Sequence, residues 1–139
     1  MYCFDTDVLS AAIWRDPPIG LIRRLGATPL PDQFTTAITI GEVLYGLERA
    51  QDAERAARVS EMLRYGPRVL PFDEAAAPIY ASIRARLERE GRRLAEPDLR
   101  IAAICLSRDL TLVTGNVRHF KDLGVRLIDP WAPAARRGR

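Results

Sequence analysis

The sequence predicts an α/β protein in which a mostly parallel sheet of about five strands is covered by helices on both faces. Short apolar segments with the composition of buried strands cover residues 2–4, 35–38, 68–72, 110–114 and 125–128. Segments with apolar residues at helical spacing separate them. Strands that alternate with helices favour a parallel sheet between two helical layers. The chain of 139 residues is long enough for one domain with its own core.

In the N-terminal half, each predicted strand is followed by helices whose ends carry capping residues. These helices are expected over residues 8–14, 19–25, 39–50 and 51–65. Asp7 is the predicted N-cap of the first, because a short acidic side chain can accept a backbone N–H at a helix start. Thr39 opens the third, where Thr39-x-x-Glu42 matches a capping box. Gly66-Pro67 ends the fourth.

The C-terminal half is organised around a helix that is predicted to be buried on most sides. Residues 101–106 are apolar without a break, which is typical of a helix surrounded by other elements. Pro97 suits the first helical position, so Asp98 falls in the opening turn. A longer helix, capped by Asp73 and ended by Gly91, is expected before it. By itself, Asp98 needs no further role than to complement the helix dipole.

Composition places the chain among ordinary soluble proteins and gives little guidance on its partners. No apolar run approaches the ~20 residues that a membrane helix needs, so no membrane segment is expected. The first residues lack the basic stretch of a signal peptide, which favours a cytoplasmic protein. Cys3 and Cys105 are expected to be small core residues without a disulfide or a metal. The net charge of +3 permits binding to a nucleic acid without requiring it.

Three acids in distant segments are candidates for one shared site. Asp5 ends the first strand, and an acid in that position must be capped, paired or metal-bound. It could cap the following helix, although Asp7 is better placed to do so. Glu42 lies opposite the apolar face of its helix, with Gly46 one turn further on, but the capping box explains Glu42 without any catalysis. Asp98 is the third acid.

These acids suggest a divalent cation if they face one cleft. Carboxylates packed together repel one another unless a cation lies among them, and Mg²⁺ or Mn²⁺ prefers carboxylate and water oxygens. A zinc-type ligand set is excluded, because His119 is the only histidine. His119 is expected to be a surface or hydrogen-bonding residue. A divalent ion can activate water without a histidine base.

Four segments resemble the motifs of the PIN domain, and most closely those of the VapC ribonuclease toxins of prokaryotic toxin–antitoxin pairs. They are Phe4-Asp5-Thr6-Asp7-Val8-Leu9, Ile40-Gly41-Glu42-Val43-Leu44-Tyr45-Gly46-Leu47, Pro97-Asp98-Leu99-Arg100-Ile101-Ala102-Ala103 and Leu112-Val113-Thr114-Gly115-Asn116-Val117-Arg118-His119-Phe120. The match spans nearly the whole chain in the family's order. The resemblance implies a PIN-like α/β/α sandwich, with residues 1–139 as a single domain. The composition of residues 132–139 by itself predicts a flexible basic tail.

The same resemblance implies an Mg²⁺-dependent endoribonuclease, for which Mn²⁺ is a substitute. Asp5, Glu42 and Asp98 would be its acidic metal ligands. Asn116 stands at a fourth position that is commonly acidic in the family, which disfavours a second tightly held metal. The resemblance also implies a homodimer and inhibition by a cognate antitoxin whose tail reaches the active site. Weaker candidates for contact with the RNA substrate are Thr6, Asp7, Arg100 and Arg118.

Arginine provides almost all of the positive charge, since Lys121 is the only lysine. Guanidinium groups suit phosphate partners, although a general preference for arginine in the genome explains the composition equally well. The arginines that could steer RNA toward the acids are Arg92, Arg93, Arg100, Arg118, Arg136, Arg137 and Arg139. For each of them, a solvated surface charge is the simpler interpretation.

Two other functions remain open from the residues alone. Asp5-Thr6-Asp7-Val8-Leu9 after an apolar strand also suggests a phosphohydrolase of the haloacid-dehalogenase type, with the first Asp as nucleophile. That chemistry needs a lysine followed by a later pair of acids, and Lys121 precedes no such pair. The second alternative is a non-catalytic PIN-like module whose acids bind a basic segment of a partner.

Overall fold

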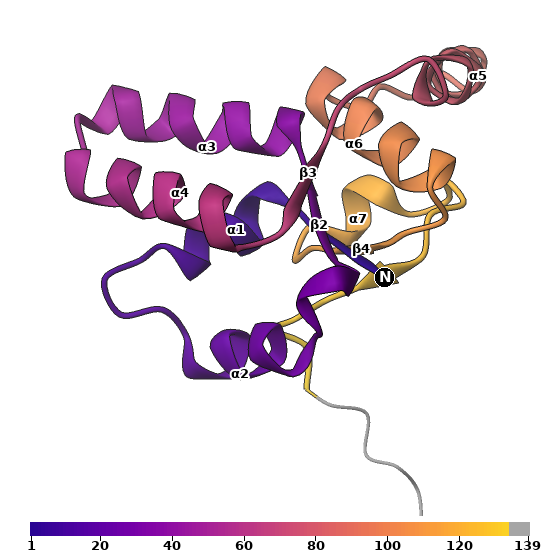
Figure 1. Cartoon of the computed structure of the whole chain (residues 1–139). Helices are drawn as coiled ribbons and strands as arrows, with labels where there is room; N and C mark the ends of the chain where they lie inside the picture. Colours follow the sequence, from indigo (N-terminus) through magenta and orange to yellow (C-terminus); the bar gives the residue numbers. More distant parts are fainter. Residues whose placement is uncertain (134–139) are drawn as a thin grey trace, which may run out of the picture.

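The computed structural model describes residues 1–133, and a parallel sheet lies at the centre of this part of the chain (Figure 1). Its strands are β1 (Tyr2–Phe4), β2 (Gln33–Thr36), β3 (Arg68–Leu70), β4 (Thr111–Val113) and β5 (Leu127–Ile128). Their order is β3-β2-β1-β4-β5, and every neighbouring pair is parallel. The predicted α/β fold with a sheet of about five strands is therefore confirmed.

The strand order makes the carboxyl ends of β1 and β4 a topological switch point, and the crevice is defined here as the region beyond those two strand ends. The chain adds β2 and β3 on one side of β1 and then returns to place β4 and β5 on the other side. Connections that leave a central strand in opposite directions diverge, and ligands of open parallel sheets bind where this happens. The residues that follow β1 and β4 consequently lie at the natural site for a ligand.

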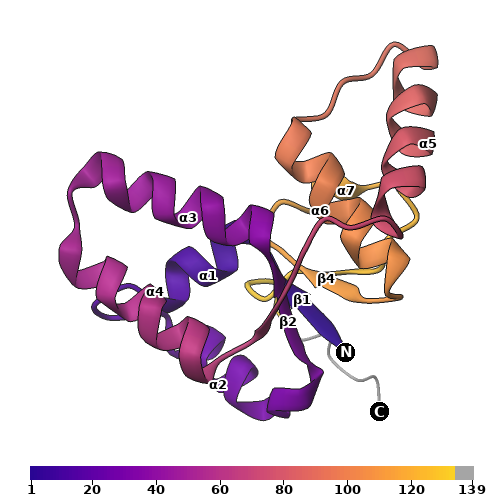
Figure 2. The same ribbon diagram turned by 45° about the horizontal axis from the view of Figure 1, so that its top comes forward.

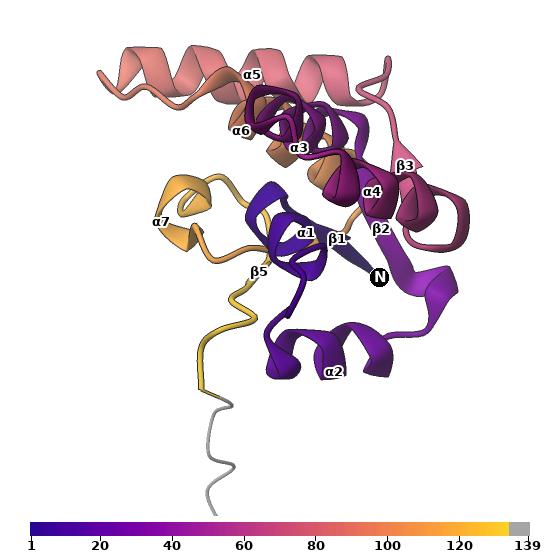
Figure 3. The ribbon, with the colours of Figure 1, turned by 90° about the vertical axis from the view of Figure 1, so that its left-hand side faces the viewer.

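The helices form separate groups on the two faces of the sheet. They are α1 (Thr6–Ala12), α2 (Ile19–Ala27), α3 (Ala37–Ala50), α4 (Ala53–Tyr65), α5 (Ala76–Arg89), α6 (Glu96–Ser107) and α7 (Val117–Phe120), with a 3-10 turn η1 (Leu30–Asp32) before β2. Figure 2 shows the α3–α4 hairpin on one side of the sheet and the α5–α6 pair on the other. In Figure 3, α2 and α5 lie at opposite ends of the molecule.

Each face of the sheet has its own apolar core. The first core lies among the helices α1, α2, α3 and α4 and includes Val8, Val43 and Val59. The second core is built around α6. Residues 101–105 of α6 are fully buried, as their uninterrupted apolar sequence predicts. Cys3 and Cys105 are buried free thiols in the second core, which confirms their predicted packing role.

The structure corrects several predicted element ends. The predicted N-cap Asp7 is wrong, because α1 begins at Thr6 and Asp5 accepts the Thr6 N–H. The predicted start of the third helix at Thr39 is also wrong. Strand β2 ends at Thr36, whose side chain accepts the Thr39 N–H and starts α3 at Ala37. Thr39-x-x-Glu42 is therefore inside the helix and is not a capping box.

Two short elements were not predicted, and one predicted segment is not described. The turn η1 and the helix α7 are too short to show a hydrophobic period of their own. Of the expected basic tail, residues 134–139, with Arg136, Arg137 and Arg139, lie outside the described residues. Within residues 1–133, no helix combines the length and the apolar character that crossing a bilayer requires.

Candidate active site

Strand β1 delivers Asp5 into the crevice between β1 and β4, where its carboxylate is almost fully buried. The Asp5 side chain is bonded on both oxygens: Oδ1 accepts the Thr6 N–H at 2.7 Å, and Oδ2 accepts the Thr114 hydroxyl at 2.7 Å. The Asp5 N–H donates to the carbonyl of Val113, which ties the end of β1 to β4. Asp5 is thus both the N-cap of α1 and a buried carboxylate.

Burial raises the pKa of Asp5 to about 6, against an ordinary value of 3.8. The hydrogen bonds from Thr114 and Thr6 oppose this shift, while the charges of Asp7 and Asp98 add to it. The three carboxylates are therefore close enough to repel one another. Because the negative charges of these acids repel one another, a cation bound among them would be stabilised.

Asp7 connects the start of α1 to the loop between β4 and α7. Its Oδ1 accepts the Val8 N–H at 2.9 Å, and its Oδ2 accepts the Gly115 N–H at 2.8 Å. Burial raises the pKa of this half-buried carboxylate as well, and these backbone bonds oppose the rise. Both oxygens already accept backbone donors, so Asp7 holds the loop in place.

Asp98 reaches the same crevice from the first turn of α6. Its Oδ2 lies 3.3 Å from Nδ1 of His119, which is the ring's contact with α6. Burial raises the pKa of Asp98, His119 opposes that rise, and the charge of Asp7 adds to it. The position of Asp98 follows from the sequence, because the apolar residues after it bury α6 and leave only its N-terminal turn at the crevice.

Glu42 lies at the rim of this group, on α3. Its Oε1 accepts the hydroxyl of Thr6 at 2.8 Å, and the Thr6 N–H is the donor that binds Asp5. Thr6 therefore connects two of the predicted acids. A side chain added at Gly46, one turn further along α3, would meet nothing within 4 Å, so the space beside Glu42 is open.

Asn116 lies at the same edge and presents its side chain to solvent. Its N–H donates to the Thr114 hydroxyl oxygen at 3.0 Å, so Thr114 links Asn116 to Asp5. Asn116 precedes α7 without a side-chain bond to the helix start. Its amide group remains available to a ligand.

The structure does not bring Arg100 to these acids. Its Nε lies 3.5 Å from Oε2 of Glu96, and its guanidinium lies 5.7 Å from the ring centre of Phe72 and 5.9 Å from that of Tyr80. Arg100 therefore faces α5, whereas Asp98 on the same helix faces the crevice. Arg118 is exposed on α7, next to His119.

The ligand types at the crevice fit Mg²⁺ better than an ion that takes all of its ligands from the protein. Among residues 1–133, no three His, Cys, Asp or Glu side chains are grouped closely enough to hold a metal by themselves. Mg²⁺ usually binds through one or two carboxylates and keeps several waters. Asp5 and Asp98 are the two carboxylates that could form such a pair, and a cation would stabilise the buried charge of Asp5.

Comparison with known proteins assigns the family. The model of the PIN domain matches residues 2–125. This chain belongs to the PIN-domain family. It is 30% identical over 137 residues to the toxin FitB of Neisseria gonorrhoeae, covering 94% of this chain and 99% of that protein. It is 37% identical over 97 residues to the tRNA(fMet)-specific endonuclease VapC of Shigella flexneri, covering 70% and 74% of the two chains.

Solved structures agree with this assignment. The crystal structure of DNA-bound VapBC from Salmonella typhimurium has a TM-score of 0.82 at 31% identity, covering 93% of this chain and 97% of that one. The FitAcB structure from Neisseria gonorrhoeae has a TM-score of 0.80 at 30% identity, covering 94% and 99%. The predicted relation to the VapC toxins is confirmed, and the Asp5-Thr6-Asp7 segment is that of a PIN domain rather than of a haloacid dehalogenase.

Sequence reasoning missed two residues of this PIN domain's crevice. Thr114 is buried and bonds Asp5, Asn116 and, at 3.5 Å, Asp7. A polar residue that ends an otherwise apolar strand is the signal that could have found it. Trp131 packs its ring against Gly115, where an added Cβ would lie 2.9 Å from the ring. No local pattern predicts this contact, because Trp131 follows a different strand.

Proposed function

We propose that this protein acts as a single PIN domain over residues 1–139 and is the Mg²⁺-dependent endoribonuclease toxin of a type II toxin–antitoxin pair. The observation that carries the proposal is the buried Asp5 carboxylate, which lies near Asp98 and Asp7 and has a pKa raised to about 6. Buried acids that share one crevice favour a divalent ion. The ribonuclease and endonuclease names of the VapC relatives support RNA as the substrate.

In this proposal Asp5 and Asp98 hold the ion, for which Mn²⁺ is a substitute, and Glu42 contributes from the rim. When bound, the ion would polarise the phosphodiester and activate water for its attack. The chain's own residues fix the geometry around it. The Thr114 hydroxyl holds one oxygen of Asp5, and the Thr6 hydroxyl orients Glu42. Asn116 is placed to orient water or the substrate through its amide.

We also propose a homodimer in the cytoplasm that is inhibited by a cognate antitoxin protein. The solved relatives include FitAB and VapBC structures. An acidic crevice attracts a basic segment electrostatically, so an antitoxin tail that carries arginine would compete with the cation there. Copurification of the chain with the product of a neighbouring small gene would test this part of the proposal.

Cleavage of RNA by the purified protein tests the catalytic assignment. We expect cleavage in Mg²⁺, none after chelation, and a loss of at least about 100-fold in Asp98→Asn, because the amide removes the charge that binds the ion. Asp109→Asn is the matched control. Asp109 is an exposed acid that precedes β4, at the opposite edge of the sheet, and it pairs with Arg126. Cleavage by Asp98→Asn at the wild-type rate would show that the site is misassigned.

A further inference from the structure

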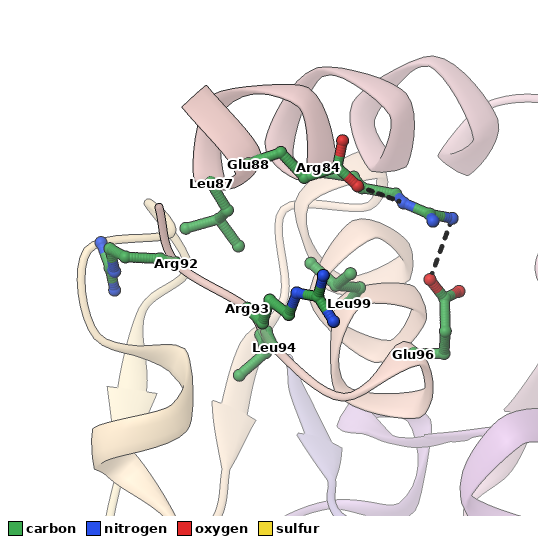
Figure 4. A pocket seen from close by; sticks show the side chains of 8 residues that line it. All are labelled: Arg84, Leu87, Glu88, Arg92, Arg93, Leu94, Glu96 and Leu99. Carbon is green, nitrogen blue, oxygen red and sulfur yellow. Dashed lines mark hydrogen bonds and ion pairs between the residues drawn. The ribbon is translucent and has the colours of Figure 1, made fainter. Parts of the chain in front are cut away.

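A hollow of about 330 Å³ lies where α5 ends and α6 begins. Its walls carry charged and apolar side chains, which are Arg84, Leu87, Glu88, Arg92, Arg93, Leu94, Glu96 and Leu99 (Figure 4). In Figure 4 the Arg93 guanidinium lies over the start of α6, whereas the Arg92 side chain extends from the other side of the connecting segment. The hollow is thus bordered by both arginines of the α5–α6 connection.

A second hollow of about 180 Å³ continues from the first toward α7. The two share Leu87, Arg92, Arg93 and Leu94, and the second also includes Arg118, His119 and Leu123. His119 contacts Asp98, with Nδ1 3.3 Å from Oδ2. A continuous surface therefore leads from the α5–α6 connection to the acids of the crevice.

The acids on this surface are already neutralised by other groups. Arg84 pairs with Glu88 at 3.1 Å and with Glu96 at 3.0 Å, as the dashed lines in Figure 4 show. Glu96 also accepts the Tyr80 hydroxyl at 2.6 Å. Glu96 is also 3.5 Å from Nε of Arg100, so Arg84 and Arg100 together compensate the charges of Glu88 and Glu96.

The remaining charge is positive. Within residues 1–133, neither Arg93 nor Arg118 pairs with an acid, and Arg92 has only a 3.4 Å contact with the exposed Glu90. The arginine channel, defined as Arg92, Arg93 and Arg118 with the two hollows between them, is an exposed path of cationic groups. Guanidinium groups bind phosphate oxygens through paired donors, and their stems can lie on apolar surface such as Leu87 and Leu94.

We propose that the arginine channel binds consecutive phosphates of single-stranded RNA on one side of the cleavage site. This inference rests on the proposed nuclease function, and it adds the direction from which the substrate approaches: from the α5–α6 connection, past α7, to Asp98. RNA is favoured over an acidic protein segment, because the channel leads to the group that would act on a phosphodiester. The sequence alone offered these arginines as individual candidates for steering RNA, without indicating which of them border one path.

Binding of a labelled single-stranded RNA to the non-cleaving Asp98→Asn protein tests the channel. The test variant is Arg92→Ala/Arg93→Ala, and its matched control is Arg23→Ala/Arg24→Ala, which removes two adjacent exposed arginines from α2. The test pair follows α5 and the control pair belongs to α2, and these two helices lie at opposite ends of the molecule (Figure 3). We expect the test variant to bind about tenfold more weakly, with a salt slope lower by about 1.4, because each single-strand phosphate contact contributes about 0.7.

The control should keep both the wild-type affinity and the wild-type slope. Equal losses of RNA affinity in the test variant and in the control variant would show unspecific charge attraction and would overturn the channel. Unchanged RNA affinity in both variants would also overturn it. Should Arg92→Ala/Arg93→Ala unfold, Arg118→Ala replaces it, with Arg23→Ala as its control and an expected decrease in slope of about 0.7. If the test variant lost as much affinity for a polyglutamate peptide as it loses for RNA, the channel would be assigned to an acidic protein segment instead.

RNA cleavage, measured on proteins that keep Asp98, distinguishes a failure of this inference from a failure of the proposed function. If the wild type binds RNA through the channel but cuts none, the nuclease proposal fails and the channel stands. If the wild type cuts RNA and the test variant retains its KM and salt dependence, the channel fails and the nuclease stands. We expect Arg92→Ala/Arg93→Ala to raise KM more than it lowers kcat, because the two arginines that it removes would bind the ground state and the transition state alike.

Discussion

At the scale of single residues, Asp5 joins two roles that make opposite demands on a carboxylate. As the N-cap of α1 it contributes most when it is ionised, but its burial in the β1–β4 crevice disfavours the charge. Burial prevails, since the pKa of Asp5 lies near 6. The ionised side chain is thus held ready for a cation at a cost to the stability of the metal-free protein.

This cost predicts a pH dependence that Asp5→Asn removes. The folded-state pKa of about 6 exceeds the ordinary 3.8, so the penalty is absent below pH 3.8, grows between these values and is complete above pH 6. A shift of this size corresponds to roughly 3 kcal/mol at most. Without metal at pH 7.5, Asp5→Asn should unfold at a higher urea concentration than the wild type, because asparagine keeps the capping oxygen.

The advantage of Asp5→Asn should disappear as the pH falls through the interval between the two pKa values. Urea unfolding curves at pH 4, 5, 6 and 7.5 measure it. A stability difference of the same size at every pH would contradict the assigned cause, since a purely steric or hydrogen-bonding effect does not titrate.

At the scale of elements, the start of α3 decides where Glu42 lies. Thr36 accepts the Thr39 N–H at 3.0 Å and bonds the Thr39 hydroxyl at 3.0 Å, both in a buried setting. This cap begins the helix directly after β2 and leaves Glu42 free of the helix start. Glu42 can therefore receive the Thr6 hydroxyl from α1.

Thr36→Ala should lower the free energy of unfolding by about 1–2 kcal/mol, because it leaves the Thr39 N–H without its buried partner. Thr36→Ser keeps the hydroxyl and serves as the matched control. Glu42→Ala should lower the free energy of unfolding by less than about 1 kcal/mol, since Glu42 caps nothing and loses only the part-buried bond from the Thr6 hydroxyl. Chemical denaturation compares the three variants. A larger effect for Glu42→Ala than for Thr36→Ala would restore the capping box that the sequence suggested.

At the scale of the whole molecule, the crevice joins elements that belong to the two separate cores. Asp5 follows β1 and begins α1, which packs on the first core, whereas Asp98 belongs to α6, the centre of the second. A cation between these carboxylates would connect both halves of the fold. An ion that binds the folded state and not the unfolded state raises the stability of the entire domain.

Mg²⁺ should therefore raise the melting temperature of the wild-type protein. At ten times its dissociation constant, an ion stabilises the fold by about 1.4 kcal/mol, which corresponds to about 5 °C for a domain of this size. Asp5→Asn/Asp98→Asn should show no such increase, while Asp109→Asn should behave as the wild type does. An equal increase in the double variant would mean that the ion binds elsewhere.

The sequence by itself determined the features that depend on local spacing. The buried α6, the strands β1 and β4, and the positions of Asp5 and Asp98 at element ends all follow from apolar runs and capping residues. The PIN relation could be read in the same way, because its motifs lie within short segments. Periodicity reports such features because neighbouring residues on one helix or strand share an environment.

Only the tertiary structure decided how those segments meet. Thr114 and Asp5 are 109 residues apart in the chain, and their bond exists because β1 and β4 are neighbours in the sheet. The same long-range packing turns Arg100 away from Asp98 and joins Arg92, Arg93 and Arg118 along one channel. Contacts between distant segments depend on strand order and helix packing, which no single stretch of sequence encodes.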